Sequence, residues 1–225
     1  MLDETPSAVL FDLDGTLIDT APDFVYIVNK LLGQENKPPL PDAEIRNCVS
    51  NGARALITLA FDLPIEHPDF EPLKKRLLDL YDQHIAVASQ LFEGMEACLN
   101  LMEANNIPWG IVTNKPSRFT DPLLDRLGLA QRSAVTICPD HVKNTKPDPE
   151  PLFKACQRIN VEPAQCIYVG DHVRDIEAGN RADMTTITAL YGYIGHNEDP
   201  LTWQADHAVE TTQDLIKLLT PVISH

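Results

Sequence analysis

The chain has 225 residues, of which 44% are hydrophobic and 23% charged, a composition that suits one globular domain or one domain with a modest insertion. Its formal net charge of −15 at pH 7 disfavours nucleic acid and anionic membrane surfaces as partners. Five cysteines, an odd number with no CxxC pair, argue against a disulfide framework or a structural zinc site.

Residues 1–7 lack the basic start and apolar run of a signal peptide. No stretch of the sequence approaches the roughly 18 consecutive apolar residues of a transmembrane helix. We therefore expect a cytoplasmic protein with reduced thiols.

The first predicted strand, Ala8–Phe11, runs directly into two aspartates, Asp12 and Asp14. In an extended backbone, residues i and i+2 point to the same side, so both carboxylates are expected beyond the carboxyl end of the strand, where open α/β sheets bind ligands. Two neighbouring anions repel unless a cation lies between them, and a hard ion such as Mg²⁺ would remove that repulsion. Gly15 permits a tight turn there. The alternative is an aspartate-rich turn without chemistry.

Nearly a hundred residues separate this strand from the next, and most of them have the apolar spacing of helices. The predicted helices cover Ala21–Leu32, Asp42–Asp62 and Pro68–Ser89. So much helix between two strands predicts an inserted helical subdomain, which returns to the core before a helix at Met95–Asn105. We expect a core domain formed by residues 1–16 and 92–225 and a helical cap formed by residues 17–91.

Short apolar runs alternate with helical segments in the rest of the chain. The expected strands are Trp109–Val112, Val135–Ile137, Ile167–Val169, Thr186–Leu190 and Ala205–Val209. The expected helices are 117–128, 150–159, 173–181 and 211–219. This alternation predicts an α/β fold with a Rossmann-like parallel sheet and helices on both faces.

Two further places offer groups for a phosphate. Thr113 and Asn114 follow the second strand and bring neutral donors, although such residues also serve as helix caps. Lys146 lies among prolines that stiffen its backbone. In a chain with so many acids, this favours an ammonium fixed in a site over one that is solvated. Its charge would screen Asp12 from an anionic substrate.

Asp171 follows the strand at 167–169, and Asp175 lies one turn into the next helix. The i, i+4 spacing places both on one helical face, directed toward the ligand crevice. The alternative is that Asp171 caps this helix and Asp175 complements its dipole. Four acids at two strand ends and one lysine nevertheless form a better site for magnesium and phosphate than a chance set of caps.

Four segments, in order along the chain, resemble the four motifs of the haloacid dehalogenase-like (HAD) superfamily: Asp12-Leu-Asp-Gly-Thr, Thr113-Asn114, Lys146-Pro147 and Gly170-Asp171-xxx-Asp175. The insertion resembles the small helical cap of the branch that holds phosphoglycolate phosphatases and β-phosphoglucomutases. Other segments, including Ser50-Asn-Gly-Ala-Arg-Ala and Leu91-Phe-Glu-Gly-Met, resemble the N-acetylmuramic acid 6-phosphate phosphatases of bacterial cell-wall recycling.

This resemblance implies a phosphatase that hydrolyses a small phosphate ester with Mg²⁺. Asp12 would be the nucleophile that becomes an aspartyl phosphate, and Asp14 the general acid and base. The ion would be held by Asp12, the backbone carbonyl of Asp14 and Asp171, with Asp175 as a further ligand or a water-bridged partner. The transferring phosphoryl group would be held by Thr113, Asn114 and Lys146.

The cap loop at Gly52, Ala53 and Arg54 occupies the place where this branch reads its substrate. The Arg54 guanidinium suits a substrate carboxylate, although an exposed cap arginine is the alternative. The expected hinges of the cap are Thr16–Thr20 and Leu91–Gly94. One departure is Asp183, where the superfamily usually has a glycine in a left-handed turn. We assign no role to His172, which we expect to be a surface residue of a loop.

Several functions remain open at this level. The preferred substrate is N-acetylmuramic acid 6-phosphate, and the alternative is 2-phosphoglycolate; both carry a carboxylate. A phosphomutase would need a second phosphate-binding site in the cap. Asp14 argues against a dehalogenase. A non-catalytic phosphate-binding protein is the remaining class. The chain is expected to act as a monomer or homodimer.

Overall fold

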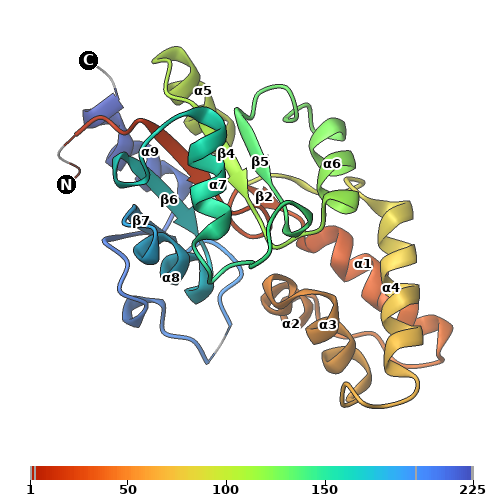
Figure 1. Cartoon of the computed structure of the whole chain (residues 1–225). Helices are drawn as coiled ribbons and strands as arrows, with labels where there is room; N and C mark the ends of the chain where they lie inside the picture. The colour runs from red at the N-terminus through yellow and green to blue at the C-terminus, as the bar shows by residue number, and fades with distance from the viewer. Residues whose placement is uncertain (1, 3, 196, 224–225) are drawn as a thin grey trace.

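The centre of the computed structural model is a six-stranded parallel sheet with strand order β5-β4-β1-β6-β7-β8 (Figure 1). The structure describes residues 2, 4–195 and 197–223. The strands are β1 (Ala8–Phe11), β4 (Trp109–Val112), β5 (Val135–Ile137), β6 (Cys166–Gly170), β7 (Thr185–Ala189) and β8 (His207–Val209). The expected α/β fold is thereby confirmed. In the part of the chain described, no helix is both long and apolar enough to span a membrane.

Strand β1 shows how the sheet is covered on both faces, because its side chains alternate between two apolar clusters. Val9 and Phe11 belong to one cluster, and Ala8 and Leu10 to the other. The helices α7 (Glu150–Ile159) and α8 (Val173–Arg181) pack on the face of Ala8 and Leu10. The helices α5 (Met95–Ala104) and α9 (Thr212–Ile223) share the cluster of Val9 and Phe11.

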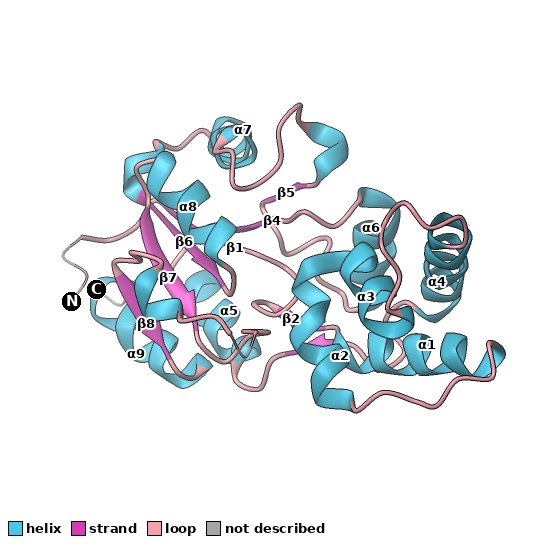
Figure 2. Ribbon diagram, turned by 90° about the horizontal axis from the view of Figure 1, so that it is seen from below, coloured by secondary structure: helices cyan, strands magenta, loops and turns pink. Residues whose placement is uncertain are grey.

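Four helices of the insertion gather beside the sheet, as Figure 2 shows from below. They are α1 (Ala21–Gln34), α2 (Asp42–Cys48), α3 (Gly52–Phe61) and α4 (Phe70–His84). The chain enters and leaves this group through β2 (Ile18–Asp19) and β3 (Gln90–Leu91), which pair in antiparallel fashion. The two connections between the sheet and the insertion therefore lie side by side, at the segments expected to act as hinges.

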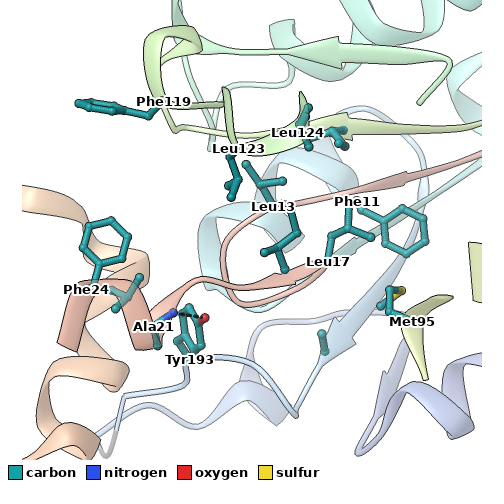
Figure 3. Packing of buried hydrophobic residues seen from close by; sticks show 14 of the residues in the cluster. Phe11, Leu13, Leu17, Ala21, Phe24, Met95, Phe119, Leu123, Leu124 and Tyr193 are labelled. Atoms are coloured by element: carbon teal, nitrogen blue, oxygen red, sulfur yellow. Dashed lines mark hydrogen bonds between the residues drawn. The ribbon is translucent and has the colours of Figure 1, made fainter. Parts of the chain in front are cut away.

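The turn after β1 joins the sheet to the helices of the insertion. Leu13 and Leu17 are buried in this turn, in the same apolar cluster as Phe24 of α1 and Phe119 of α6 (Ser117–Arg126) (Figure 3). The backbone nitrogen of Ala21, the first residue of α1, donates to the hydroxyl of Tyr193 at 2.9 Å. The start of the insertion is therefore anchored to the core by packing and by one buried hydrogen bond.

The prediction of one continuous helix over residues 42–62 is wrong. Helix α2 ends at Cys48, a 3-10 turn covers Val49–Asn51, and α3 begins at Gly52, whose φ of +78° suits glycine. The apolar spacing continues on both sides of this break, so the periodicity gave no sign of it. The left-handed turn expected at Asp183 is confirmed, with φ of +59°.

Candidate active site

Three buried carboxylates meet at the carboxyl ends of β1 and β6. Asp12 follows β1, Asp171 follows β6, and Asp175 lies in the first turn of α8. One carboxylate oxygen from each lies within 4.8 Å of the others. Gly15 makes this approach possible, because a Cβ added there would lie 2.1 Å from an oxygen of Asp171.

Lys146 is the cation of this cluster. Its ammonium lies 2.7 Å from an oxygen of Asp12 and 2.7 Å from an oxygen of Asp175, and it also donates to Tyr168 and to the carbonyl of Val112. The residue is only 3% exposed. Burial lowers the pKa of Lys146, but the two aspartates outweigh that effect and raise it, so the ammonium stays charged.

One lysine does not balance three buried acids. Burial and the charge of Asp175 raise the pKa of Asp12 to about 6, although Lys146 opposes the shift. Burial, Asp12 and Asp175 raise the pKa of Asp171 to about 8. A set of carboxylate oxygens that is short of positive charge suits a hard divalent cation, which would bring all three acids to the ionised form. The residues present therefore fit a divalent metal.

This charge imbalance predicts how the stability of the metal-free protein depends on pH. The pKa values of Asp12 and Asp171 lie above the value of 3.8 for an unperturbed aspartate, so the native state binds more protons than the unfolded state between about pH 4 and pH 8. Unfolding free energy measured in EDTA is therefore expected to fall as pH rises through this range. Asp171→Asn should flatten the fall, and a wild-type free energy that rises instead would contradict the prediction.

The side chain of Asp14 is not part of the three-acid cluster. Its Oδ1 accepts a hydrogen bond of 2.6 Å from Thr20 and one of 2.9 Å from the ammonium of Lys115. The sequence reasoning gave Lys115 no role, although it directly follows the pair Thr113-Asn114. Burial lowers the pKa of Lys115, but Asp14 and Tyr81 outweigh it and raise the pKa. A second buried cation thus stands opposite the proposed acid and base.

The two remaining residues of the expected phosphate site lie at the end of β4. Thr113 is buried, and its Oγ1 accepts a hydrogen bond of 3.1 Å from the backbone of Lys115, which leaves its hydroxyl hydrogen for a ligand. The amide of Asn114 donates to the carbonyl of Lys146 at 3.0 Å and accepts from its nitrogen at 3.2 Å. The side chain of Asn114 therefore positions the Lys146 loop and retains one free amide hydrogen.

A cavity of about 400 Å³ lies between these groups and the insertion. Its polar wall includes Asp12, Asp14, Thr113, Asn114 and Lys146. The opposite wall contains the loop residues Gly52, Ala53 and Arg54, so the structure brings the expected recognition loop to the cavity. Large apolar side chains fill much of the rest: Phe24, Val49, Leu78, Tyr81 and Phe119.

The loop of the insertion also contacts the acid cluster and α8. Ser50 donates to Oδ2 of Asp171 at 3.1 Å, and Arg174 donates to the carbonyl of Ser50. His172 is the residue that caps α8, through Nδ1, while its Nε2 lies 3.2 Å from Oδ1 of Asn51. Burial and Arg174 lower the pKa of His172 to about 4, so the neutral ring donates to Asn51. His172 is thus a contact between insertion and core rather than a surface loop residue, and Asp171 is not the cap.

Comparisons with known proteins agree with this geometry. The family model described as "Haloacid dehalogenase-like hydrolase" matches residues 9–189. The chain is 49% identical in sequence to the N-acetylmuramic acid 6-phosphate phosphatase of Pseudomonas putida, and the match covers 94% of this chain and 95% of that protein. It is 43% identical in sequence to the phosphoglycolate phosphatase of Xanthomonas campestris, and the match covers 93% of this chain and 95% of that protein. A crystal structure from Haemophilus somnus, titled as a predicted phosphoglycolate phosphatase, is 25% identical, with a TM-score of 0.82, and the match covers 94% of this chain and 97% of that one.

Proposed function

Because the chain belongs to the haloacid dehalogenase-like hydrolase family, we propose that it is a Mg²⁺-dependent phosphomonoester hydrolase. The observation that carries this proposal is the cluster of Asp12, Asp171 and Asp175 with Lys146, of which Asp12 and Lys146 line the cavity. A nucleophile, a set of metal ligands and a buried cation beside one cavity are the parts that phosphoryl transfer requires. Asp12 and Asp14 are proposed as the catalytic pair.

In the first step, a carboxylate oxygen of Asp12 forms a bond to phosphorus while the bond from phosphorus to the ester oxygen breaks. Asp14 gives its proton to the leaving oxygen, which departs as the alcohol. In the second step, water attacks the phosphorus of the aspartyl phosphate, and Asp14 takes a proton from that water. Phosphate leaves and Asp12 returns to its carboxylate form.

Asp12, Asp171 and Asp175 would hold the metal ion with their side chains, and Asp14 would add its backbone carbonyl. When bound, the ion supplies a positive charge that stabilises the transferring phosphoryl group. Lys146 and the hydroxyl of Thr113 are proposed to bind the oxygens of that group. Asn114 supports them by holding the backbone of Lys146.

N-acetylmuramic acid 6-phosphate is the proposed substrate. The cavity volume of about 400 Å³ lies within the usual range of small-molecule sites, and its wall combines Arg54 with large apolar side chains. An amino sugar with acetyl and lactyl methyl groups offers apolar surface to such a wall and a carboxylate to Arg54. The alternative substrate, 2-phosphoglycolate, has a carboxylate but only two carbons and no methyl group, so it leaves the apolar side chains without contact.

Residues 17–91 are proposed as a cap that closes over the site and excludes water. The antiparallel pair of β2 and β3 would be its hinge, and the contacts of Ser50 and Asn51 with α8 would hold it closed. A cytoplasmic location and a monomeric or homodimeric state complete the proposal.

Phosphate release from the two candidate esters tests the proposed function. The purified protein is assayed with N-acetylmuramic acid 6-phosphate and with 2-phosphoglycolate, each with Mg²⁺ and with EDTA. We expect kcat/KM to be at least roughly a hundredfold higher for the sugar ester, and EDTA to abolish turnover. Preference for 2-phosphoglycolate would overturn the proposed substrate but not the reaction. No hydrolysis of either ester, or of p-nitrophenyl phosphate, by the folded protein would overturn the reaction.

Arg54 is exposed and lines the cavity, and it is the residue proposed to bind the substrate carboxylate. For Arg54→Gln we expect kcat/KM on N-acetylmuramic acid 6-phosphate to fall by about tenfold to a hundredfold, because a charge-assisted hydrogen bond is lost. Activity on p-nitrophenyl phosphate, which has no carboxylate, should not change. Arg76→Gln, in which a cap arginine paired with Glu35 is replaced, is the matched control. An equal loss on both esters in Arg54→Gln would contradict this role.

A further inference from the structure

The side chain of Ser50 connects the insertion to the carboxylate cluster of the core. Its hydroxyl donates a hydrogen bond of 3.1 Å to Oδ2 of Asp171, which is buried. Among the described residues, Asp171 accepts two further hydrogen bonds, one of 3.0 Å from the hydroxyl of Thr16 and one of 2.8 Å from the backbone nitrogen of Tyr193. Thr16 and Tyr193 belong to the core, so Ser50 is the donor that the insertion supplies.

These hydrogen bonds are divided unevenly between the two oxygens of Asp171. Oδ2 accepts from Ser50 and from Tyr193, whereas Oδ1 accepts from Thr16. A carboxylate oxygen offers about two lone-pair sites, so Oδ2 has a donor for each and Oδ1 retains one site for an ion. Ser50 therefore does not compete for the site that Oδ1 retains, and it holds the carboxylate through the other oxygen.

The chain around Ser50 is itself fixed against the start of α8. Ser50 lies in the 3-10 turn Val49–Asn51, and its carbonyl accepts a hydrogen bond from the guanidinium of Arg174. Oδ1 of the next residue, Asn51, lies 3.2 Å from Nε2 of His172. Each of these contacts joins the insertion to the core. If the insertion moves away, they are lost, and the hydrogen bond of Ser50 to the acid cluster is lost with them.

We propose that Ser50 is a positioning residue for the metal site, whose hydroxyl holds Asp171 in the orientation that binds a divalent cation while the insertion lies against the core. The inference rests on the proposed function, because it takes Asp171 as a metal ligand, and it adds a regulation of that site. A donor that orients a ligand carboxylate is typically worth about tenfold to a hundredfold in metal affinity. The effect is reciprocal: the closed cap strengthens binding of the ion, and the bound ion favours the closed cap by the same factor.

Ser50→Ala tests the proposal, because it removes the hydroxyl and leaves Asp171 with its two donors from the core. The probe is Mn²⁺, which suits the same oxygen ligands as Mg²⁺ and is followed by electron paramagnetic resonance on the full-length protein without substrate. We expect the dissociation constant of Mn²⁺ to rise by about tenfold, the lower end of the range, because Thr16 and Tyr193 still hold the carboxylate. Ser50→Thr keeps a hydroxyl and should bind Mn²⁺ as the wild type does.

The reciprocal effect is measured by hydrogen–deuterium exchange in the peptide that covers residues 49–54. Saturating Mg²⁺ should slow exchange there in the wild type, because the bound ion favours the closed cap. In Ser50→Ala the same ion should slow exchange less, since the hydroxyl that links the ion to the insertion is absent. Equal slowing in the two proteins would contradict the reciprocal effect.

Thr58→Ala is the matched control, since it removes an exposed hydroxyl of the insertion that bonds to the carbonyl of Leu63 and does not line the cavity. Its affinity for Mn²⁺ should equal that of the wild type. An unchanged dissociation constant in Ser50→Ala, or an equal rise in Ser50→Thr, overturns the inference, while the proposed function stands if the wild type hydrolyses phosphate esters with Mg²⁺. A folded wild-type protein that binds neither ion overturns the proposed metal dependence, and the inference with it.

Discussion

Asp12→Asn is expected to reduce the rate of phosphate release by at least roughly 10⁴-fold, because removal of an enzyme's nucleophile typically lowers kcat by that much or more. A carboxamide has no anionic oxygen to attack phosphorus, so no aspartyl phosphate can form. Steady-state release of phosphate with Mg²⁺ measures the loss. Intact-protein mass spectrometry of the wild type, quenched in acid during turnover, should show the mass of one added phosphoryl group, which Asp12→Asn should lack.

The folded state should survive this substitution. Asparagine keeps the shape of the side chain and an oxygen that can accept from Lys146, which lies 2.7 Å from Asp12 in the wild type. It also removes one of the repelling charges that raise the pKa of Asp171. The melting temperature in EDTA at neutral pH should therefore be unchanged or higher than that of the wild type. Asp79→Asn, at a residue of α4 that pairs with Lys75 on the surface and does not line the cavity, is the control and should keep full activity. Retention of more than roughly one hundredth of wild-type turnover by Asp12→Asn would contradict the proposal that Asp12 is the nucleophile.

The sheet was predictable because its strands are short apolar runs bounded by polar or turn residues. Strands β1, β4 and β5 and helices α7 and α8 have the bounds that the sequence pattern predicts. The strand pair β2 and β3 was not predictable, since two residues in each strand carry no alternation. The break before Gly52 was not predictable either, because a local backbone angle interrupts the helix while the apolar spacing continues.

The acids of the candidate site could be predicted because Asp12 and Asp171 follow strands of one parallel sheet, whose strands end at the same edge, and Asp175 lies one helical turn after Asp171. The structure brings Asp12, Asp171 and Asp175 together as that argument requires. The contact of Lys115 with Asp14 could not be derived, because it depends on how the loop after β4 bends toward the loop after β1. The contact of Ser50 with Asp171 could not be derived either, because it depends on how the insertion packs against the core.

Lys146→Met is expected to lower the unfolding free energy of the metal-free protein by about 3–5 kcal/mol at neutral pH. The substitution removes the cation that lies 2.7 Å from both Asp12 and Asp175, all of them buried, and puts an apolar side chain of similar length in its place. The two carboxylates are then left without compensation, which is the costly way to break a buried ion pair. Phosphate release should also fall, by about 10²-fold to 10³-fold, because the charge proposed to stabilise the transferring group is lost.

The pH dependence of this loss separates the charge effect from a packing defect. Asp12 has a pKa of about 6 even with Lys146 in place, so without the lysine it should take up a proton more readily as pH falls. The deficit in unfolding free energy, measured by urea titration in EDTA, should therefore be smaller at about pH 5 than at about pH 8. Added Mg²⁺ at the higher pH should restore part of the stability but not the activity, because the ion compensates the carboxylates without replacing the ammonium. Lys143→Met, which changes an exposed lysine of the same loop, should leave both quantities unchanged. A deficit that is equal at both pH values would show that the lost packing, and not the lost charge, destabilises the variant.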